Sequence, residues 1–340
     1  MSQPNRDTAN AMLLHRPGTP ETMVPGTIEV PSPRQGELRV QVLACGLNPV
    51  DWKTARTGLP SWSWPHVLGQ DIVGIITAIG PDGDTTDLGR LAIVHQSLPR
   101  NGGLAQTSLV TAAATARIPT TTNVLAAATI PCAGLTAAQA VERTHVTADD
   151  QILIIGAAGA VGTFATQLVA QRLTGGSSRA PRRGEITALV GPADLDRVVH
   201  LGADEALDYT QGPLTEVLAN RRFDVILDLV GAESSRSAGL LLGYGGRLAS
   251  VSRPDWGVPP FTTAPTLVEL ALGAAYDTGT TADLRWMAAT LVDLVELVSQ
   301  GELVTPRFVV GSLDEAPNLL AAMASGESSG KPVIEVQNGN

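Results

Sequence analysis

The stretch that decides the fold is Gln151-Ile-Leu-Ile-Ile-Gly-Ala-Ala-Gly-Ala-Val-Gly162, in which a compact apolar segment leads into three glycines. Gly156, Gly159 and Gly162 have the spacing GxxGxxG, and a helix-compatible segment, 160–173, follows them. This pattern is typical of a dinucleotide-binding turn. The first glycine permits a tight strand-to-helix turn, the second lets the backbone approach a pyrophosphate, and the third lets the helix pack closely on the strand.

The residues around this turn predict an α/β fold with a β-rich N-terminal lobe and a doubly wound parallel sheet. Downstream, apolar segments alternate with helix-length segments, which is typical of a parallel sheet covered by helices. Upstream, short apolar runs are bounded by glycine or proline, which favours a mostly β module. The expected strands are 11–14, 38–44, 72–79, 91–94, 151–155, 186–190, 225–229, 247–251 and 332–336, and the expected helices are 126–143, 160–173, 284–300 and 314–324, with a short one starting at Pro49.

Composition excludes several classes of protein. The 340 residues include 23 Lys and Arg against 33 Asp and Glu, a net charge of −10, which argues against nucleic acid or an anionic membrane as the main partner. The hydrophobic fraction of 44% excludes global disorder. Two cysteines, Cys45 and Cys132, cannot supply a disulfide framework or a four-cysteine zinc site. Residues 1–10 are polar and no long apolar run follows, so we expect a soluble, cytoplasmic protein.

The end of the second predicted strand bears on the choice of cofactor. In proteins that bind NAD, an acidic residue at this position holds the ribose hydroxyls. Here the strand ends at Val190-Gly191-Pro192 without an acid, which favours NADPH over NADH, although Asp194 follows closely. Arg179, Arg182 and Arg183 precede the strand and are therefore expected to be solvated loop charges.

Several stretches together resemble one family. They are Ala44-Cys-Gly-Leu-Asn-Pro-Val-Asp-Trp-Lys53, Val67-Leu-Gly-Gln-Asp-Ile-Val-Gly74, Pro131-Cys-Ala-Gly-Leu-Thr-Ala137, the glycine turn, Gly202-Ala-Asp204 with Tyr209, Phe223-Asp-Val-Ile-Leu-Asp228, Gly245-Gly-Arg-Leu248 and Gly330-Lys-Pro-Val-Ile-Glu335. The chain resembles the medium-chain dehydrogenase/reductase superfamily, and within it the zinc-free quinone oxidoreductase (zeta-crystallin-like) branch. The resemblance implies a GroES-like catalytic domain from 1–125 and 301–340, a Rossmann domain at 126–300, and a homodimer through an edge strand at Val268–Ala275.

The resemblance also implies that no metal is bound. Zinc-containing members hold the ion with a Cys, a His and a second Cys, and Asn48, Gln70 and Cys132 stand near those places here. Two neutral amides with one thiol match zinc poorly, because its usual ligands are thiolate, imidazole and carboxylate. We therefore expect a site without metal.

Without a metal, hydride transfer depends on placement and hydrogen-bond donors. The resemblance points to Asn48 as a donor to the substrate oxygen or the nicotinamide ribose. Lys53 would donate to a developing enolate, although relatives often have tyrosine near that position and a solvated lysine is the alternative. Asp51, like Asp71, would orient donors or simply make structural hydrogen bonds. Gln70 would line the substrate cavity.

The resemblance implies further contacts to the cofactor. Thr136 would lie near the nicotinamide, Ala160 and Val161 at the pyrophosphate, Tyr209 by the adenosine phosphate and Gly231 beside the ribose. The remaining positions lie at ends of predicted strands, where ligands of α/β sheets bind; they are Gly191, Ser250, Val251 and Ser252.

These features predict an NADPH-dependent reductase of quinones or of the C=C bond of α,β-unsaturated carbonyl compounds. Two alternatives stay open. One is a zinc-free alcohol or ketone dehydrogenase on the same scaffold, and the other is a non-catalytic NADPH-binding protein.

Overall fold

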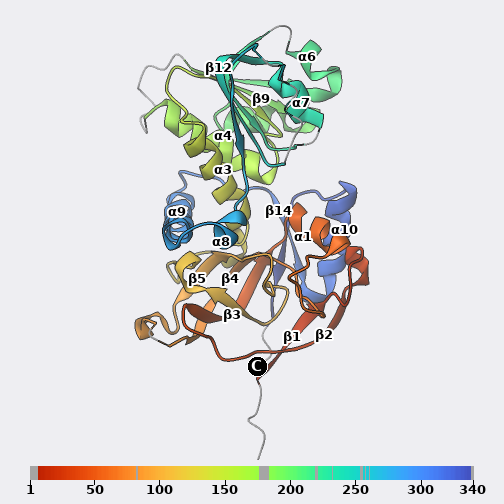
Figure 1. Ribbon diagram of the computed structural model, residues 1–340, viewed down its shortest axis with the longest axis vertical. Coiled ribbons are helices and arrows are strands. Elements are labelled where there is room, and N and C mark those ends of the chain that lie inside the picture. The colour runs from red at the N-terminus through yellow and green to blue at the C-terminus, as the bar shows by residue number, and fades with distance from the viewer. Residues whose placement is uncertain are drawn as a thin grey trace, which may run out of the picture. The chain divides into compact units, whose positions relative to one another are not determined.

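The computed structural model describes residues 7–81, 83–175, 184–218, 221–231, 233–252, 256, 258–259 and 261–337. The chain forms two compact units (Figure 1), and the second is inserted into the first. The first unit, here called the catalytic lobe, comprises 1–132, 273–302 and 307–340. The second, here called the Rossmann unit, comprises 133–272 and 303–306. The expected solvated loop arginines, Arg179, Arg182 and Arg183, lie outside the described residues.

The catalytic lobe is built on β-sheet, as the sequence predicts. A seven-stranded sheet has the order β14-β15-β3-β4-β5-β7, with β6 paired to β3, and β1 pairs with β2 in a separate two-stranded sheet. The strands are β1 (Thr8–Leu13), β2 (Val24–Glu29), β3 (Glu37–Gly46), β4 (Asp71–Ile79), β5 (Leu91–His95), β6 (Thr107–Thr111), β7 (Ala116–Arg117), β14 (Phe308–Ser312) and β15 (Lys331–Glu335). The helices of this lobe are α1 (Pro49–Thr57), α2 (Val124–Ala127), α8 (Ala274–Asp277), α9 (Thr281–Ser299) and α10 (Ala316–Ser325).

The Rossmann unit contains a six-stranded parallel sheet of order β10-β9-β8-β11-β12-β13. Counted from β8, this is the order 3-2-1-4-5-6 of a doubly wound dinucleotide fold, so the predicted fold class is confirmed. The strands are β8 (Gln151–Ile155), β9 (Glu185–Val190), β10 (Glu205–Asp208), β11 (Phe223–Asp228), β12 (Leu242–Ser250) and β13 (Thr266–Glu269). The helices are α3 (Pro131–Arg143), whose first two residues belong to the catalytic lobe, α4 (Ala160–Leu173), α5 (Leu195–His200), α6 (Leu214–Val217) and α7 (Glu233–Gly239).

Three expectations about boundaries need correction. The single helix expected over 126–143 is two helices, α2 and α3, because Pro131 begins a new first turn. The strand expected over Val268–Ala275 is confined to β13, and Ala274 begins α8. The expected Rossmann domain of 126–300 also loses its last part, because residues 273–302 belong to the catalytic lobe.

Helix α9 explains the last correction. Its buried stripe is Met287, Leu291, Leu294 and Val295, and the helix packs on β5, on β7 and on the short 3-10 helix at Ala112–Ala114. The amphipathic pattern predicts the helix itself, but it does not identify the sheet on which that helix packs.

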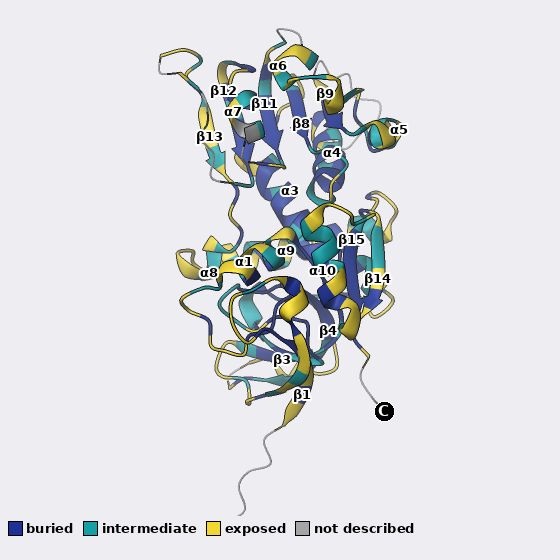
Figure 2. Ribbon diagram, turned by 90° about the vertical axis from the view of Figure 1, so that its right-hand side faces the viewer, coloured by how far each residue is buried: buried dark blue, intermediate teal, exposed yellow. Residues whose placement is uncertain are grey.

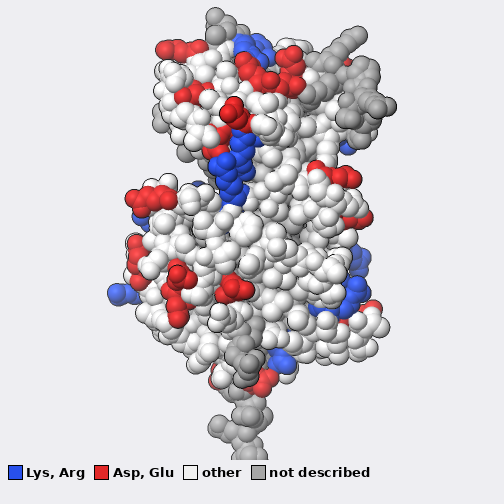
Figure 3. All heavy atoms as spheres, turned by 180° about the vertical axis from the view of Figure 1, so that it is seen from behind, with Lys and Arg blue, Asp and Glu red and all other residues white. Residues whose placement is uncertain are grey.

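Each unit buries its own apolar core, seen as dark blue in Figure 2. Strand β3 alternates half-buried and buried residues, and β5 is buried along its whole length. On the face drawn in Figure 3, charged side chains form small groups among uncharged surface, in keeping with the 16% of charged residues. None of the helices in the described ranges combines the length and the apolar character needed to cross a lipid bilayer.

Candidate active site

The glycine turn of the Rossmann unit gives each of its three glycines a different surrounding. Gly156 has φ of +79°, the left-handed region in which glycine is favoured. A Cβ on Gly162 would lie 2.2 Å from the carbonyl oxygen of Gly156, so α4 can approach β8 only without a side chain there. A Cβ on Gly159 would meet nothing closer than 3.3 Å. The turn therefore has the three distinct requirements that a dinucleotide-binding turn imposes.

The start of α4 follows directly from this turn. Gly159 is the N-cap, and because glycine has no side chain, the N-cap residue offers no side-chain acceptor to the first turn, which holds Ala160 and Val161. The N-terminus of a 14-residue helix carries partial positive charge and free N–H groups that bind anions. These two features fit a diphosphate at the turn.

Next to the turn, the end of β11 is organised by a buried carboxylate that sequence reasoning did not assign. Oδ1 of Asp228 accepts hydrogen bonds from the backbone N–H groups of Val230 and Gly231, at 3.2 and 3.0 Å. Ser250 Oγ donates to Oδ2 of Asp228 at 3.3 Å. Strands β8 and β11 are neighbours at the point where the strand order reverses, which is where doubly wound sheets bind ligands.

Gly231 illustrates how closely these segments approach. It has φ of +82°, and a Cβ there would lie 2.2 Å from Oγ of Ser252. The structure thus brings Gly231, Ser250 and Ser252 together with the glycine turn. Val251 lies between the two serines, and its N–H donates to the carbonyl oxygen of Asp228 at 3.2 Å.

The end of β9 holds the groups expected near the adenosine. Gly191 follows the strand, and a Cβ there would lie 3.6 Å from the ring of Tyr209. Arg197, from α5, donates to the carbonyl oxygen of Ala158 in the glycine turn and to Oγ1 of Thr163, both at 2.9 Å. Its guanidinium also lies 3.7 Å from Asp194. Thr136 is buried in α3. The role of Arg197 could not be read from the sequence, because its partners lie on another element.

In the catalytic lobe, a buried polar cluster surrounds Asp71. Oδ1 of Asp71 accepts from His95 Nδ1 and from the backbone N–H of Cys132, both at 2.9 Å. Oδ2 accepts from Asn48 Nδ2 and Lys331 Nζ, again at 2.9 Å each. Lys331 also donates to Oδ1 of Asn48. The carboxamide of Asn48, expected to serve a substrate or cofactor oxygen, is therefore engaged within the protein.

Burial and neighbouring charges shift the pKa values of the carboxyl groups in this cluster. Burial alone would raise the pKa of Asp71, but the Lys331 ammonium and the hydrogen bond from His95 lower the pKa below its ordinary value. Burial raises the pKa of Asp51 to about 7, and the charge of Asp71 adds to this effect. Asp51 accepts backbone hydrogen bonds from Asn48 at 2.7 Å and Gly69 at 3.0 Å. These bonds hold the start of α1 against the loop before β4.

The other two predicted catalytic residues differ in their surroundings. Lys53 is exposed on α1, with Nζ 5.7 Å from the centroid of the Trp52 ring. Gln70 is buried, and its Oε1 has no hydrogen-bond partner among the described residues. An unpaired buried polar atom costs about 1–3 kcal/mol, so it calls for a ligand or another explanation.

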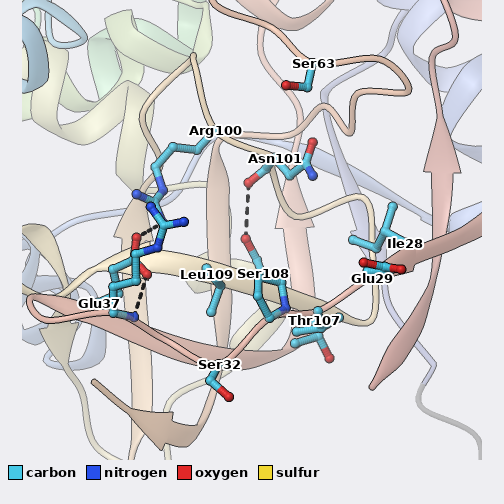
Figure 4. Close-up of a pocket in the computed structure, with 13 residues that line it drawn as sticks. Ile28, Glu29, Ser32, Glu37, Ser63, Arg100, Asn101, Thr107, Ser108 and Leu109 are labelled. Atoms are coloured by element: carbon cyan, nitrogen blue, oxygen red, sulfur yellow. Dashed lines mark hydrogen bonds and ion pairs between the residues drawn. The ribbon is translucent and has the colours of Figure 1, made fainter. Parts of the chain in front are cut away.

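A groove of about 460 Å³ in the catalytic lobe is lined by none of the predicted site residues (Figure 4). Its walls come from β2, the loop between β2 and β3, β6 and the loop before β6, and the ion pair of Arg100 and Glu37, at 2.7 Å, crosses one side. Because its polar groups largely pair with one another, this groove does not provide the reactive groups that the predicted chemistry needs.

The cluster around Asp71 also tests whether zinc fits. Among the described residues, Asp71, His95 and Cys132 form a group whose potential ligand atoms lie within 4.8 Å of one another. Both oxygens of Asp71 already accept two hydrogen bonds each, and the Lys331 ammonium is one of the donors. A divalent ion here would meet an occupied carboxylate and a neighbouring positive charge, so the residues present do not fit zinc.

Two buried groups predict opposite dependences of stability on pH. The pKa of Asp51 is raised from 3.8 to about 7. The folded state therefore becomes less stable as pH rises through this window, because the unfolded chain releases the proton first. Burial lowers the pKa of His66, stacked on Trp62, from 6.5 to about 4, so folding weakens as pH falls through that window. Each shift corresponds to about 3–4 kcal/mol.

As pH rises from about 4.5 to 6.5, we therefore expect the His66→Gln variant, in which only Asp51 of this pair still titrates, to become less stable. Over the same rise, the Asp51→Asn variant, in which only His66 still titrates, should become more stable. The urea midpoint of each variant at the two pH values measures this. An equal change of the urea midpoint with pH in the two variants would contradict the pKa shifts assigned to Asp51 and His66.

Comparisons with known proteins agree with this architecture. Residues 34–172 match the family model of the alcohol dehydrogenase GroES-like domain, and residues 201–334 match that of zinc-binding dehydrogenases. The chain is 26% identical to the chloroplastic quinone-oxidoreductase QR1 of Triphysaria versicolor, over 91% of this chain and 92% of that protein. It is 30% identical to the chloroplast envelope quinone oxidoreductase homolog of Arabidopsis thaliana, over 59% of this chain and 61% of that protein, which is less than two thirds of its length.

Solved structures show the same fold. The quinone oxidoreductase from Coxiella burnetii superposes with a TM-score of 0.79 at 22% identity, covering 97% of this chain and 100% of that one. A GroES-like lobe joined to a doubly wound nucleotide-binding unit is the domain combination that these two family models describe. The chain belongs to the medium-chain dehydrogenase/reductase superfamily, in its quinone oxidoreductase-like branch. Membership implies a nicotinamide cofactor.

Proposed function

We propose that this protein is a zinc-independent, NADPH-dependent oxidoreductase that reduces a quinone or the C=C bond of an α,β-unsaturated carbonyl compound. The observation that carries the proposal is the glycine turn at the reversal of strand order, where Gly156 has a positive φ and Gly162 has no room for a side chain. The names of the quinone oxidoreductase relatives support the substrate class.

The Rossmann unit offers a complete set of groups to hold the cofactor. Gly156, Gly159 and the start of α4 would bind the diphosphate, with Tyr209 beside the adenosine and Gly231 and Ser250 beside a ribose. The nicotinamide, once bound, supplies the hydride. The end of β9 carries no acid, and Asp194, which follows it closely in sequence, lies 3.7 Å from the guanidinium of Arg197, which favours the phosphate-bearing cofactor.

The catalytic lobe would stabilise the negative charge that develops on the substrate and would supply the proton that completes the reduction. Negative charge develops on the substrate oxygen during reduction, and a donor stabilises it. Gln70 has an unpaired buried carboxamide oxygen that a hydroxyl of the substrate or of the reduced product would satisfy. Lys53 has an exposed ammonium that would return the proton. Asn48 and Asp51 would act as positioning residues that fix α1, which carries Lys53.

The test compares NADPH and NADH oxidation against a quinone series and an enone series. Faster oxidation of NADPH, with hydroquinone or saturated ketone as product, supports the proposal. An alcohol as product would indicate a zinc-free alcohol or ketone dehydrogenase. Tight cofactor binding without oxidation by any substrate would indicate a binding protein, and faster oxidation of NADH would overturn the cofactor assignment.

Gln70 and Gln96 form a matched pair for testing the substrate contact. Both are buried, but Gln96 Nε2 donates to the carbonyl oxygen of Leu109 at 2.7 Å, whereas Gln70 Oε1 has no partner in the part of the chain that the structure describes. We expect Gln70→Met to leave thermal stability unchanged or higher while KM rises about tenfold, and Gln96→Met to lose about 1–3 kcal/mol of stability. Loss of stability in the Gln70 variant with unchanged KM would assign it a structural role.

Lys53 and Arg56 form a second matched pair, because both cations lie near the ring of Trp52, at 5.7 and 5.3 Å from its centroid. We expect Lys53→Met to lower kcat by about 100-fold, the usual contribution of a general acid, without changing the cofactor Kd. Arg56→Met should retain kcat. Equal kcat in both variants would remove Lys53 from the proton-donor role.

The homodimer remains a proposal that rests on β13. This strand is the edge of the parallel sheet, and three of its four residues are exposed. Light scattering of the purified protein, with a Val268→Lys variant as control, tests it: a dimer that this variant dissociates supports pairing through β13. The cytoplasmic location likewise stays a prediction.

A further inference from the structure

The buried polar cluster of the catalytic lobe combines three metal-binding side chains with an ammonium group. We propose that Lys331 is the resident cation of this cluster, and that it keeps a divalent metal out of a latent site formed by Asp71, His95 and Cys132. The inference concerns the catalytic lobe alone; it rests on the zinc independence proposed above, and not on the choice of substrate or cofactor.

The three side chains come from different elements and are held in place by the backbone. Asp71 and His95 face each other in the antiparallel register of β4 and β5. Cys132 lies at the start of α3, and its N–H donates to Oδ1 of Asp71. The potential ligand atoms all lie within 4.8 Å of one another. Carboxylate, imidazole and thiolate are the ligands that Zn²⁺ and Co²⁺ accept.

Lys331 opposes metal binding in two ways. Its Nζ lies 2.9 Å from Oδ2 of Asp71 and also donates to Asn48, so it takes part of the coordination capacity of the carboxylate. Its positive charge is buried, at 6% exposure, and like charges in such an environment repel strongly. Without this ammonium, the carboxylate of Asp71 would lack its buried counter-ion, and a metal ion would replace it.

The experiment titrates Co²⁺ into the purified full chain, because a cobalt–thiolate bond gives an intense near-ultraviolet charge-transfer band. We expect no band in the native protein and a band at one equivalent in Lys331→Met, whose melting temperature rises when Zn²⁺ or Co²⁺ is added. Adding Cys132→Ser to the methionine variant should abolish the band. Lys331→Arg keeps the charge and should not bind.

Lys331→Gln is the second variant in case the methionine variant does not fold without metal. The glutamine can still bond Asp71 and Asn48 but carries no charge, and both variants are refolded with and without Co²⁺. Folding that requires Co²⁺ and yields the thiolate band supports the proposal. A one-equivalent band in the native protein that Cys132→Ser removes would overturn it, as would the absence of a band in both neutral variants.

Discussion

Alanine substitution at Gly159 is expected to weaken cofactor binding at least tenfold, about 1.4 kcal/mol, while leaving the protein folded. A Cβ at this position would meet only the Gly156 carbonyl oxygen, at 3.3 Å, so the free protein needs a shift of only a few tenths of an ångström to accept it. The methyl group would instead stand where the diphosphate backbone contact is predicted. Cofactor titration by fluorescence quenching measures the loss.

The neighbouring Gly162→Ala variant should fail for a different reason. Its Cβ would lie 2.2 Å from the carbonyl oxygen of Gly156 and 2.5 Å from Cα of Ala157, both backbone atoms, so α4 must move off the sheet. We expect a loss of about 1–3 kcal/mol in stability, together with loss of binding. Gly243→Ala is the control, since the nearest atom to its Cβ would be the carbonyl oxygen of Phe223, at an ordinary contact distance of 3.5 Å. Full cofactor affinity in the folded Gly159 variant would contradict the predicted site.

Replacing Asp71 by asparagine is expected to lower the unfolding free energy of the catalytic lobe by about 3–5 kcal/mol. The substitution leaves the buried ammonium of Lys331 without its counter-ion and removes the charged acceptor of His95. The double variant Asp71→Asn with Lys331→Met should lose less than the sum of the two single variants, because neither charge is then left alone.

Urea unfolding followed by tryptophan fluorescence measures this cycle. Four of the five tryptophans, Trp52, Trp62, Trp64 and Trp286, belong to the catalytic lobe, so the signal reports mainly on that unit. Single-variant effects that add up fully in the double variant would show that the two charges do not stabilise each other in the folded lobe.

The sequence predicts the Rossmann unit well because its signals are local. The predicted helix 160–173 coincides with α4, and Gly156 and Gly162 have the positive φ and the close helix packing that their spacing implies. Strand, turn and helix lie within one short segment, so the pattern alone defines their geometry.

The cluster around Asp71 could not be predicted in the same way. Asp71 and Lys331 are 260 residues apart, and nothing near either residue identifies the other as its partner. His95 likewise contacts Asp71 only through the pairing of β4 and β5, and the placement of α9 with the catalytic lobe depends on the strands that it covers. Contacts of this kind are a property of the tertiary fold, not of periodicity.

The insertion of one unit into the other has a consequence for biosynthesis. The segment 133–272 contains all six strands of its parallel sheet, so every strand partner of that sheet is synthesised before the C-terminal part of the catalytic lobe. Strand β3 can pair with β15, its neighbour in the sheet, only after residues 331–335 have been synthesised. Until then the carboxylate of Asp71 has no ammonium group beside it. A nascent chain arrested before Lys331 would therefore expose this carboxylate to chaperones and to free metal ions.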